Sequence, residues 1–172
     1  MNETTLTLNI ERAISELRRG GKVVIADPNF GTSVLLVAAE LIDKKTVEKL
    51  SNQTLSRPNI ILSSNRSNAI GIKVTDEPCS ILIDKHWTVR DILSLCMPLT
   101  GHKIPTINGV IIEDIKSIVS YCLLILRQSR LLPAGLMSII SNVPPENVNK
   151  WAYENNFIHV DISEIGLSLI HI

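Results

Sequence analysis

The sequence has few aromatic residues and no excess of charge of either sign. Only 3% of its 172 residues are Phe, Trp or Tyr, while 45% are hydrophobic, so the core has to be built mainly from Ile, Leu and Val. The 17 basic residues are balanced by 17 acidic residues. Nucleic acids and anionic membranes attract proteins through a net basic field. We therefore expect no nucleic-acid partner and no membrane partner.

Long apolar runs and paired cysteines are absent as well. The longest apolar-rich stretch, residues 118–126, is too short to span a bilayer and contains Ser120 and Tyr121. Residues 1–12 lack the basic start and apolar core of a signal peptide. The three cysteines include no Cys-x-x-Cys pair, which argues against a zinc site or a redox dithiol. We expect them to be buried free thiols of a cytoplasmic protein.

The length and the pattern of apolar residues predict one α/β domain spanning residues 1–172, a mixed sheet with helical layers. Short runs rich in β-branched residues alternate with segments of helical periodicity, and no repeat or linker interrupts them. We expect helices at about 10–17, 44–53, 89–95, 113–130 and 146–155, and strands at 23–26, 34–39, 60–62, 80–84, 136–140 and 157–161.

Several polar residues are placed to begin helices. Asn9, Asp43 and Thr88 each precede a helical pattern and are typical N-cap residues. Residues 63–78 are polar and predict an irregular segment, with a possible edge strand at 70–74. The apolar tail, residues 167–172, either covers a partner surface or packs into the core of its own chain.

The stretch of residues 21–40 organises this pattern. Two apolar runs flank a loop of turn-forming residues from Asp27 to Ser33. Loops between core strands commonly carry chemistry, because a rigid scaffold then positions them. This loop holds one carboxylate, Asp27, and no base. Asp27 is therefore either a catalytic candidate or simply the first residue of a turn.

Five segments in this order resemble the 3,4-dihydroxy-2-butanone-4-phosphate synthase family of riboflavin biosynthesis. The resemblance implies the fold of that family, a homodimer with active sites at its interface, and a lyase reaction. That reaction converts ribulose 5-phosphate into a four-carbon ketone phosphate and formate, with magnesium and positioned acid–base groups. The similar segments are 10–27 with 35–50, Ser80–Asp84, Gly101-His102 with Pro105, 132–140 and 151–165.

Most of the catalytic residues that the resemblance implies are missing. The acidic loop of the family corresponds to Asp27–Ser33, which lacks its arginine and its metal-binding glutamate. The family's His-Thr-Glu segment, counted back from Pro133, falls on Ile118, Val119 and Ser120. His102 alone stands clearly at a family functional position. The remaining candidates near the family's substrate loop are Thr88, Arg90 and Asp91.

The resemblance therefore implies two catalytic candidates, His102 and Asp27. It implies three substrate-binding candidates, Thr88, Arg90 and Asp91. Each also has a plain structural interpretation: His102 as a loop residue, Thr88 as a helix cap, and Arg90 as a surface residue. We expect no metal site and no cofactor, because Asp27 alone is a poor magnesium site.

These losses predict a homologue without synthase activity, a pseudoenzyme, because a missing general base alone costs a factor of about 10²–10⁴ in rate. Two other roles remain open. The chain is either a binding or regulatory module acting through the inherited dimer surface, or it has a remodelled cleft for another phosphorylated small molecule. For the second role, residues 63–68 either hold a phosphate through their hydroxyls and Arg66 or form a solvated loop.

Overall fold

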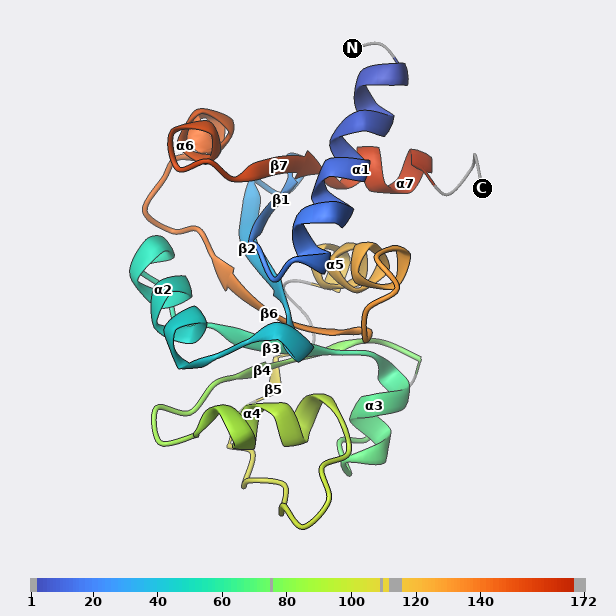
Figure 1. Ribbon diagram of the computed structural model, residues 1–172, viewed down its shortest axis with the longest axis vertical. Coiled ribbons are helices and arrows are strands. Elements are labelled where there is room, and N and C mark those ends of the chain that lie inside the picture. The colour runs from blue at the N-terminus through green and yellow to red at the C-terminus, as the bar shows by residue number, and fades with distance from the viewer. Residues whose placement is uncertain (1–2, 75, 109, 112–115, 169–172) are drawn as a thin grey trace.

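The chain folds around one seven-stranded mixed sheet with helices on both faces (Figure 1). The computed structural model describes residues 3–74, 76–108, 110–111 and 116–168. The strand order is β5-β4-β3-β6-β2-β1-β7; β1 and β7 are parallel, and all other neighbours are antiparallel. The predicted α/β class and mixed sheet are confirmed. The strands are β1 (Val23–Asp27), β2 (Thr32–Ala38), β3 (Asn59–Leu62), β4 (Cys79–Leu82), β5 (Val110–Ile111), β6 (Ala134–Ile139) and β7 (Ile158–Asp161).

The helices divide between the two faces of the sheet. One core cluster joins the sheet to α1, α5 and α7, and a second cluster on the other face joins it to α2, α4 and α6. The helices are α1 (Glu3–Arg18), α2 (Lys44–Thr54), α3 (Ser64–Ala69), α4 (Val89–Cys96), α5 (Lys116–Gln128), α6 (Val148–Glu154) and α7 (Ile162–Ser168), with 3₁₀ turns η1 (Ala39–Leu41) and η2 (Pro145–Asn147).

The central strands are apolar on both sides because both faces are covered. Along β1, Val23 and Ile25 belong to the α1–α5–α7 cluster, whereas Val24 between them belongs to the other cluster. Leu35 and Leu36 of β2 divide in the same way, and all five residues are fully buried. Doubly covered strands read as continuous β-branched runs rather than alternating ones. This is why residues 21–40 stand out in the sequence.

Two of the predicted caps are present, and the third is wrong. Asp43 and Thr88 each form a capping box with the residue three positions on, Thr46 and Asp91. Asn9 lies inside α1, because that helix begins at Glu3. The first two turns of α1 contain mostly polar residues, so they show no apolar periodicity from which a helix could be predicted.

The polar segment after β3 was also predicted wrongly. Residues 64–69 form α3, capped by Ser63, and no strand forms at 70–74. Instead, the side-chain amide of Asn68 makes two hydrogen bonds to the backbone of Val74, each 3.1 Å long. These bonds satisfy backbone groups that a strand would have paired with a neighbour.

Smaller differences concern element ends and the C-terminal region. Strand β6 begins at Ala134, two residues earlier than predicted, and α7 was not predicted. The predicted start of the long helix at 113 lies outside the described residues, as do residues 169–172 of the apolar tail. All three cysteines are buried free thiols. Among the described residues, no helix combines the length and the apolar content needed to cross a bilayer.

Candidate functional site

The loop between β1 and β2 is a tight hairpin turn. Asp27 pairs with Thr32 at the end of the two strands, which leaves only residues 28–31 as the connection. The side chain of Asp27 is buried, and its Oδ1 atom accepts a hydrogen bond of 3.1 Å from the backbone N–H of Asn29. Gly31 has a φ of 62°, which a residue with a side chain rarely adopts. The carboxylate of Asp27 therefore organises the turn.

Three of the other candidates form one cluster at the start of α4. The hydroxyl of Thr88 accepts a hydrogen bond from the N–H of Asp91, and one oxygen of Asp91 accepts from the hydroxyl and the N–H of Thr88. The other oxygen of Asp91 lies 2.9 Å from Nε2 of His102. Hydrogen bonds from Thr88, and then from His102, lower the pKa of Asp91. Arg90, on the same helix, is exposed.

The structure does not bring Asp27 to this cluster. Strand β1 is four inter-strand spacings from β4, about 19 Å across the sheet, and α4 follows β4 in the chain. Figure 1 shows α4 beneath the β3–β4 edge and β1 at the opposite edge beside β7. The catalytic pair predicted from the sequence is therefore split between two ends of the fold.

The side chains of the described residues do not fit a magnesium ion. Magnesium prefers an octahedral set of oxygen ligands that usually includes one or two carboxylates and several waters. Asp27 has no second carboxylate beside it in its turn, and Asp91 already binds Thr88 and His102. In the described part of the chain, no group of three or more His, Cys, Asp or Glu side chains is arranged to hold a metal.

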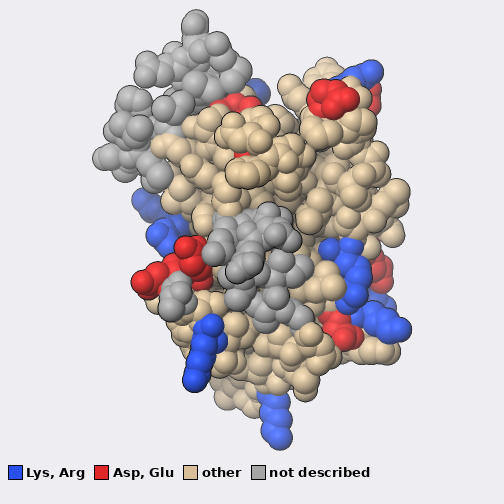
Figure 2. Space-filling model, turned by 180° about the vertical axis from the view of Figure 1, so that it is seen from behind, with Lys and Arg blue, Asp and Glu red and all other residues tan. Residues whose placement is uncertain are grey.

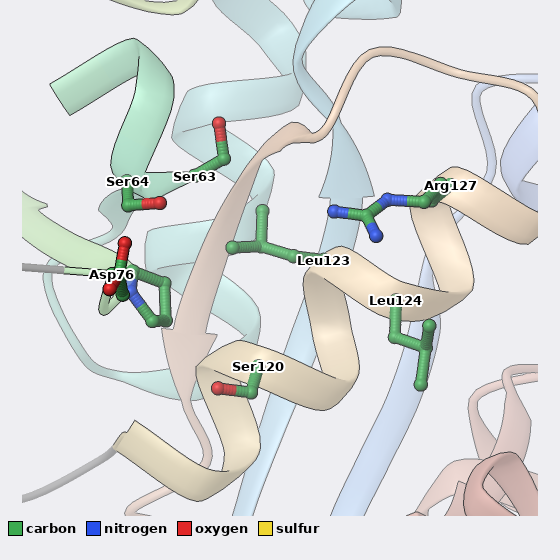
Figure 3. A pocket seen from close by; sticks show the side chains of 8 residues that line it. Ser63, Ser64, Asp76, Ser120, Leu123, Leu124 and Arg127 are labelled. Carbon is green, nitrogen blue, oxygen red and sulfur yellow. The ribbon is translucent and has the colours of Figure 1, made fainter. Parts of the chain in front are cut away.

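A pocket lined by both polar and apolar side chains lies elsewhere, between α3 and α5, with a volume of about 220 Å³. Figure 3 shows the guanidinium of Arg127 extending from α5 over Leu123, with Ser64 and Asp76 on the opposite wall. Ser120 is the residue to which the glutamate of the family's His-Thr-Glu segment carries over. The pocket is lined by Ser63, Ser64, Asp76, Pro78, Ser120, Leu123, Leu124 and Arg127.

Asp76 and Arg127 were missed by reasoning from the sequence. Ser120, Leu124 and Arg127 follow one another at steps of four and three residues, so they lie on one face of α5. That spacing was a usable signal. No sequence pattern pointed to Asp76, because it lies in an irregular loop with no periodicity. Its backbone there is in the left-handed region, with a φ of 44°.

Arg66 is committed to another role. Its Nε and Nη2 atoms donate hydrogen bonds of 2.7 and 2.6 Å to the carbonyl oxygens of Leu95 and Ser94, at the C-terminal end of α4. These carbonyls lack partners within their helix and carry the negative end of its dipole. The guanidinium therefore caps α4 and does not line the α3–α5 pocket.

The described charges form no continuous basic field on the face of the molecule opposite to the view of Figure 1. Figure 2 shows Lys and Arg side chains near the margins of this face, with Asp and Glu side chains close to several of them. This face therefore offers no basic patch that would argue for a polyanionic partner.

No protein-family model matches the chain, and no curated protein matches it. Solved structures do. The cation-free form of a 3,4-dihydroxy-2-butanone 4-phosphate synthase superposes with a TM-score of 0.74 at 12% identity, covering 94% of this chain and 97% of the other. The chain has the fold of this synthase. The fold that the sequence resemblance implied is thus confirmed.

Two further synthase structures support the same fold. The enzyme from Candida albicans gives a TM-score of 0.70 at 15% identity, over 93% of this chain and 96% of the other. A synthase in complex with two magnesium ions gives 0.69 at 12% identity, over 91% and 94%. At these identities the likeness establishes the fold and leaves the chemistry to be argued from the site.

Proposed function

We propose that the chain is a relative of the synthase that lacks synthase activity and binds a small phosphorylated polyol in the α3–α5 pocket. The observation that carries this proposal is the composition of the pocket. It offers hydroxyl groups, one carboxylate and one guanidinium, while the described residues offer no carboxylate cluster for magnesium.

The case against synthase activity rests on the number of groups lost. The reaction of the family moves several protons and builds negative charge on oxygen, which requires acid–base groups and a divalent cation. Asp27 is buried in its turn, and His102 pairs with Asp91 at the other end of the sheet. The loss of a general base and a metal together removes most of the rate enhancement that such a mechanism provides.

The case for a polyol phosphate rests on complementarity. A guanidinium binds phosphate through two parallel hydrogen bonds, and Arg127 is the cation of this pocket. The hydroxyls of Ser63, Ser64 and Ser120 and the carboxylate of Asp76 are suited to the hydroxyl groups of a sugar. The apolar side chains of Leu123 and Leu124 in the lining favour the carbon skeleton, and a volume of about 220 Å³, below the usual range for drug-sized ligands, restricts the ligand to a few carbons.

A calorimetric titration with ribulose 5-phosphate, ribose 5-phosphate and inorganic phosphate tests the binding. We expect saturable binding of at least one sugar phosphate, weakened about tenfold or more by Arg127→Gln, and unchanged by Arg12→Gln, an exposed substitution on α1. An assay of formate release from ribulose 5-phosphate with magnesium should show no turnover. Formate release at an ordinary enzymatic rate would overturn the proposed loss of activity.

The same samples also address the regulatory alternative. The family resemblance implies a homodimer, and we propose this assembly for the chain, to be measured by light scattering. A stable dimer that binds none of the sugar phosphates would contradict the polyol-phosphate site and favour a binding or regulatory module that acts through its dimer surface.

A further inference from the structure

A larger pocket lies against the second core cluster, between α2 and the connection from β4 to α4. Its volume is about 550 Å³. Thr88 is one of its lining residues, whereas neither His102 nor Asp91 lines it. Small-molecule sites typically have volumes of about 300–1,000 Å³ and mostly apolar walls with a few placed polar groups. This pocket has both properties, and it belongs to neither the α3–α5 pocket nor the β1–β2 turn.

The walls are apolar and come from three separate segments. Ile83 and Ile92 are buried in the core cluster beneath the pocket, and Val47, Trp87 and Val89 pack against that cluster while remaining partly exposed. The strand end that forms the floor is held in place, because the N–H of Ile83 donates to the carbonyl oxygen of Pro58 over 3.1 Å. A half-buried indole beside aliphatic side chains offers a flat surface for a ring.

The charges at the mouth are unequal. Lys44 and Glu48 lie 3.9 Å apart and offset one another. The remaining charged side chains are Arg57, Lys85 and Asp84, two cations against one carboxylate. The Nη2 atom of Arg57 donates a hydrogen bond of 2.6 Å to the carbonyl oxygen of Ile83, which fixes the guanidinium at the pocket. The carboxylate of Asp84 accepts a hydrogen bond from the backbone N–H of His86, which fixes the position of this negative charge in the pocket lining.

We propose that this α2–α4 pocket binds a flat aromatic monoanion, with the ring against Trp87 and Ile92 and the anionic group at Arg57 and Lys85. The apolar walls supply affinity for the ring, and the surplus of one positive charge favours a single negative charge over a neutral ligand. A guanidinium already oriented by a backbone carbonyl loses little freedom when it binds a carboxylate, sulfonate or phosphate. This site is independent of the polyol phosphate proposed for the α3–α5 pocket.

The two tryptophans make the proposal directly measurable. Trp151 packs against Phe157, with ring centroids 5.5 Å apart, and does not line the pocket, so Trp151→Phe leaves Trp87 as the single indole reporter. The probe is anilinonaphthalene sulfonate, an aromatic monoanion that quenches indole emission by energy transfer. We expect saturable quenching with one site per chain, and binding about tenfold weaker for phenylnaphthylamine, the neutral ring without the sulfonate.

Charge variants separate the anion contact from general apolar binding. The double variant Arg57→Gln/Lys85→Gln should weaken probe binding about tenfold. Its matched control is Lys45→Gln/Lys49→Gln, which removes two exposed lysines of α2 that do not line the pocket and should leave the affinity unchanged. Asp84→Asn should tighten binding, because it removes the one opposing carboxylate.

Two results would overturn the proposal. One is equal affinity in the charge variant and its control, which would assign binding to apolar contact alone. The other is unchanged quenching in Ser51→Phe, a substitution on α2 that places a ring in the pocket, because the probe would then bind elsewhere. Circular dichroism melts of both variants distinguish lost binding from lost folding, and Asp84→Asn tests the site without changing its apolar walls.

Discussion

The Nε2 atom of His102 lies 2.9 Å from the Oδ1 atom of Asp91, the same residue that closes the capping box of α4. The histidine that most resembles a functional residue of the synthase is thus bound to a helix-capping carboxylate. This contact ties the loop after α4 to the start of that helix. It gives the Thr88–Asp91–His102 cluster a structural role that can be measured apart from any ligand.

Asp91→Asn should destabilise the protein by about 1 kcal/mol near neutral pH, the usual loss for a disrupted helix cap. Hydrogen bonds from Thr88, and then from His102, lower the pKa of Asp91 in the folded state. A lowered carboxyl pKa stabilises the protein above the unfolded value of about 3.9, and that contribution disappears as the pH falls through the folded pKa.

The difference in unfolding free energy between wild type and Asp91→Asn should therefore be present at pH 6 and shrink below about pH 4. Urea denaturation at a series of pH values measures it. Glu77→Gln removes an exposed carboxylate and serves as the control. A difference that stays constant down to the most acidic measurable pH would exclude this role for the Asp91 charge.

Arg66→Ala should destabilise the protein by about 2 kcal/mol, since it removes two charge-assisted hydrogen bonds to the end of α4. Arg66→Lys keeps the charge near the helix dipole but loses the planar fork, so its effect should be intermediate. Thermal melts give the order of stability. Arg90→Ala, exposed at the other end of α4, is the control and should change stability by less than about 0.5 kcal/mol.

Glu164→Gln should stabilise the protein at alkaline pH. Glu164 is only 6% exposed, its Oε2 atom has no hydrogen-bond partner among the described residues, and burial followed by the nearby charge of Asp161 raises its pKa to about 7. Because the folded pKa exceeds the unfolded one, wild-type stability falls as the pH rises from about 4.5 to 7 and stays low above that.

The stabilisation by Glu164→Gln should accordingly be absent near pH 4 and reach the order of 2 kcal/mol at pH 8. Chemical denaturation of both proteins across this range measures it, with exposed Glu146→Gln as the control. An equal difference between variant and wild type at pH 4 and pH 8 would contradict a buried carboxyl that titrates near neutrality.

Gly135→Ala should destabilise the protein by about 1–3 kcal/mol, the usual range for overpacking a core. A Cβ atom at Gly135 would lie 2.9 Å from both Leu126 Cδ1 and the carbonyl oxygen of Val37, so the Leu126 side chain would have to rotate and the backbone of β2 or β6 would have to shift. Gly166→Ala in α7 is the comparison, because its Cβ atom would make only ordinary van der Waals contacts, with the ring of Tyr121 on α5. Denaturant midpoints should fall for the first variant and not for the second.

The sequence alone determined the class of the fold and most of its elements. Doubly buried strands such as β1 and β2 carry continuous apolar runs, and the caps Asp43 and Thr88 use side chains that reach only three residues along the chain. Such local patterns can be recognised in the sequence without knowledge of the tertiary structure. The order of segments also predicted the synthase fold, which the superposition at 12% identity confirms.

The tertiary structure alone decided how the polar residues are grouped. Asn68 binds Val74 in place of a strand, and Arg66 caps a helix almost thirty residues further on. Asp27 lies on β1, four strand spacings from β4, the strand that precedes α4 and the loop with His102. Both pockets combine segments distant in sequence, such as Asp76 with Arg127. Polar contacts of this kind depend on distances across the fold, which neither periodicity nor composition encodes.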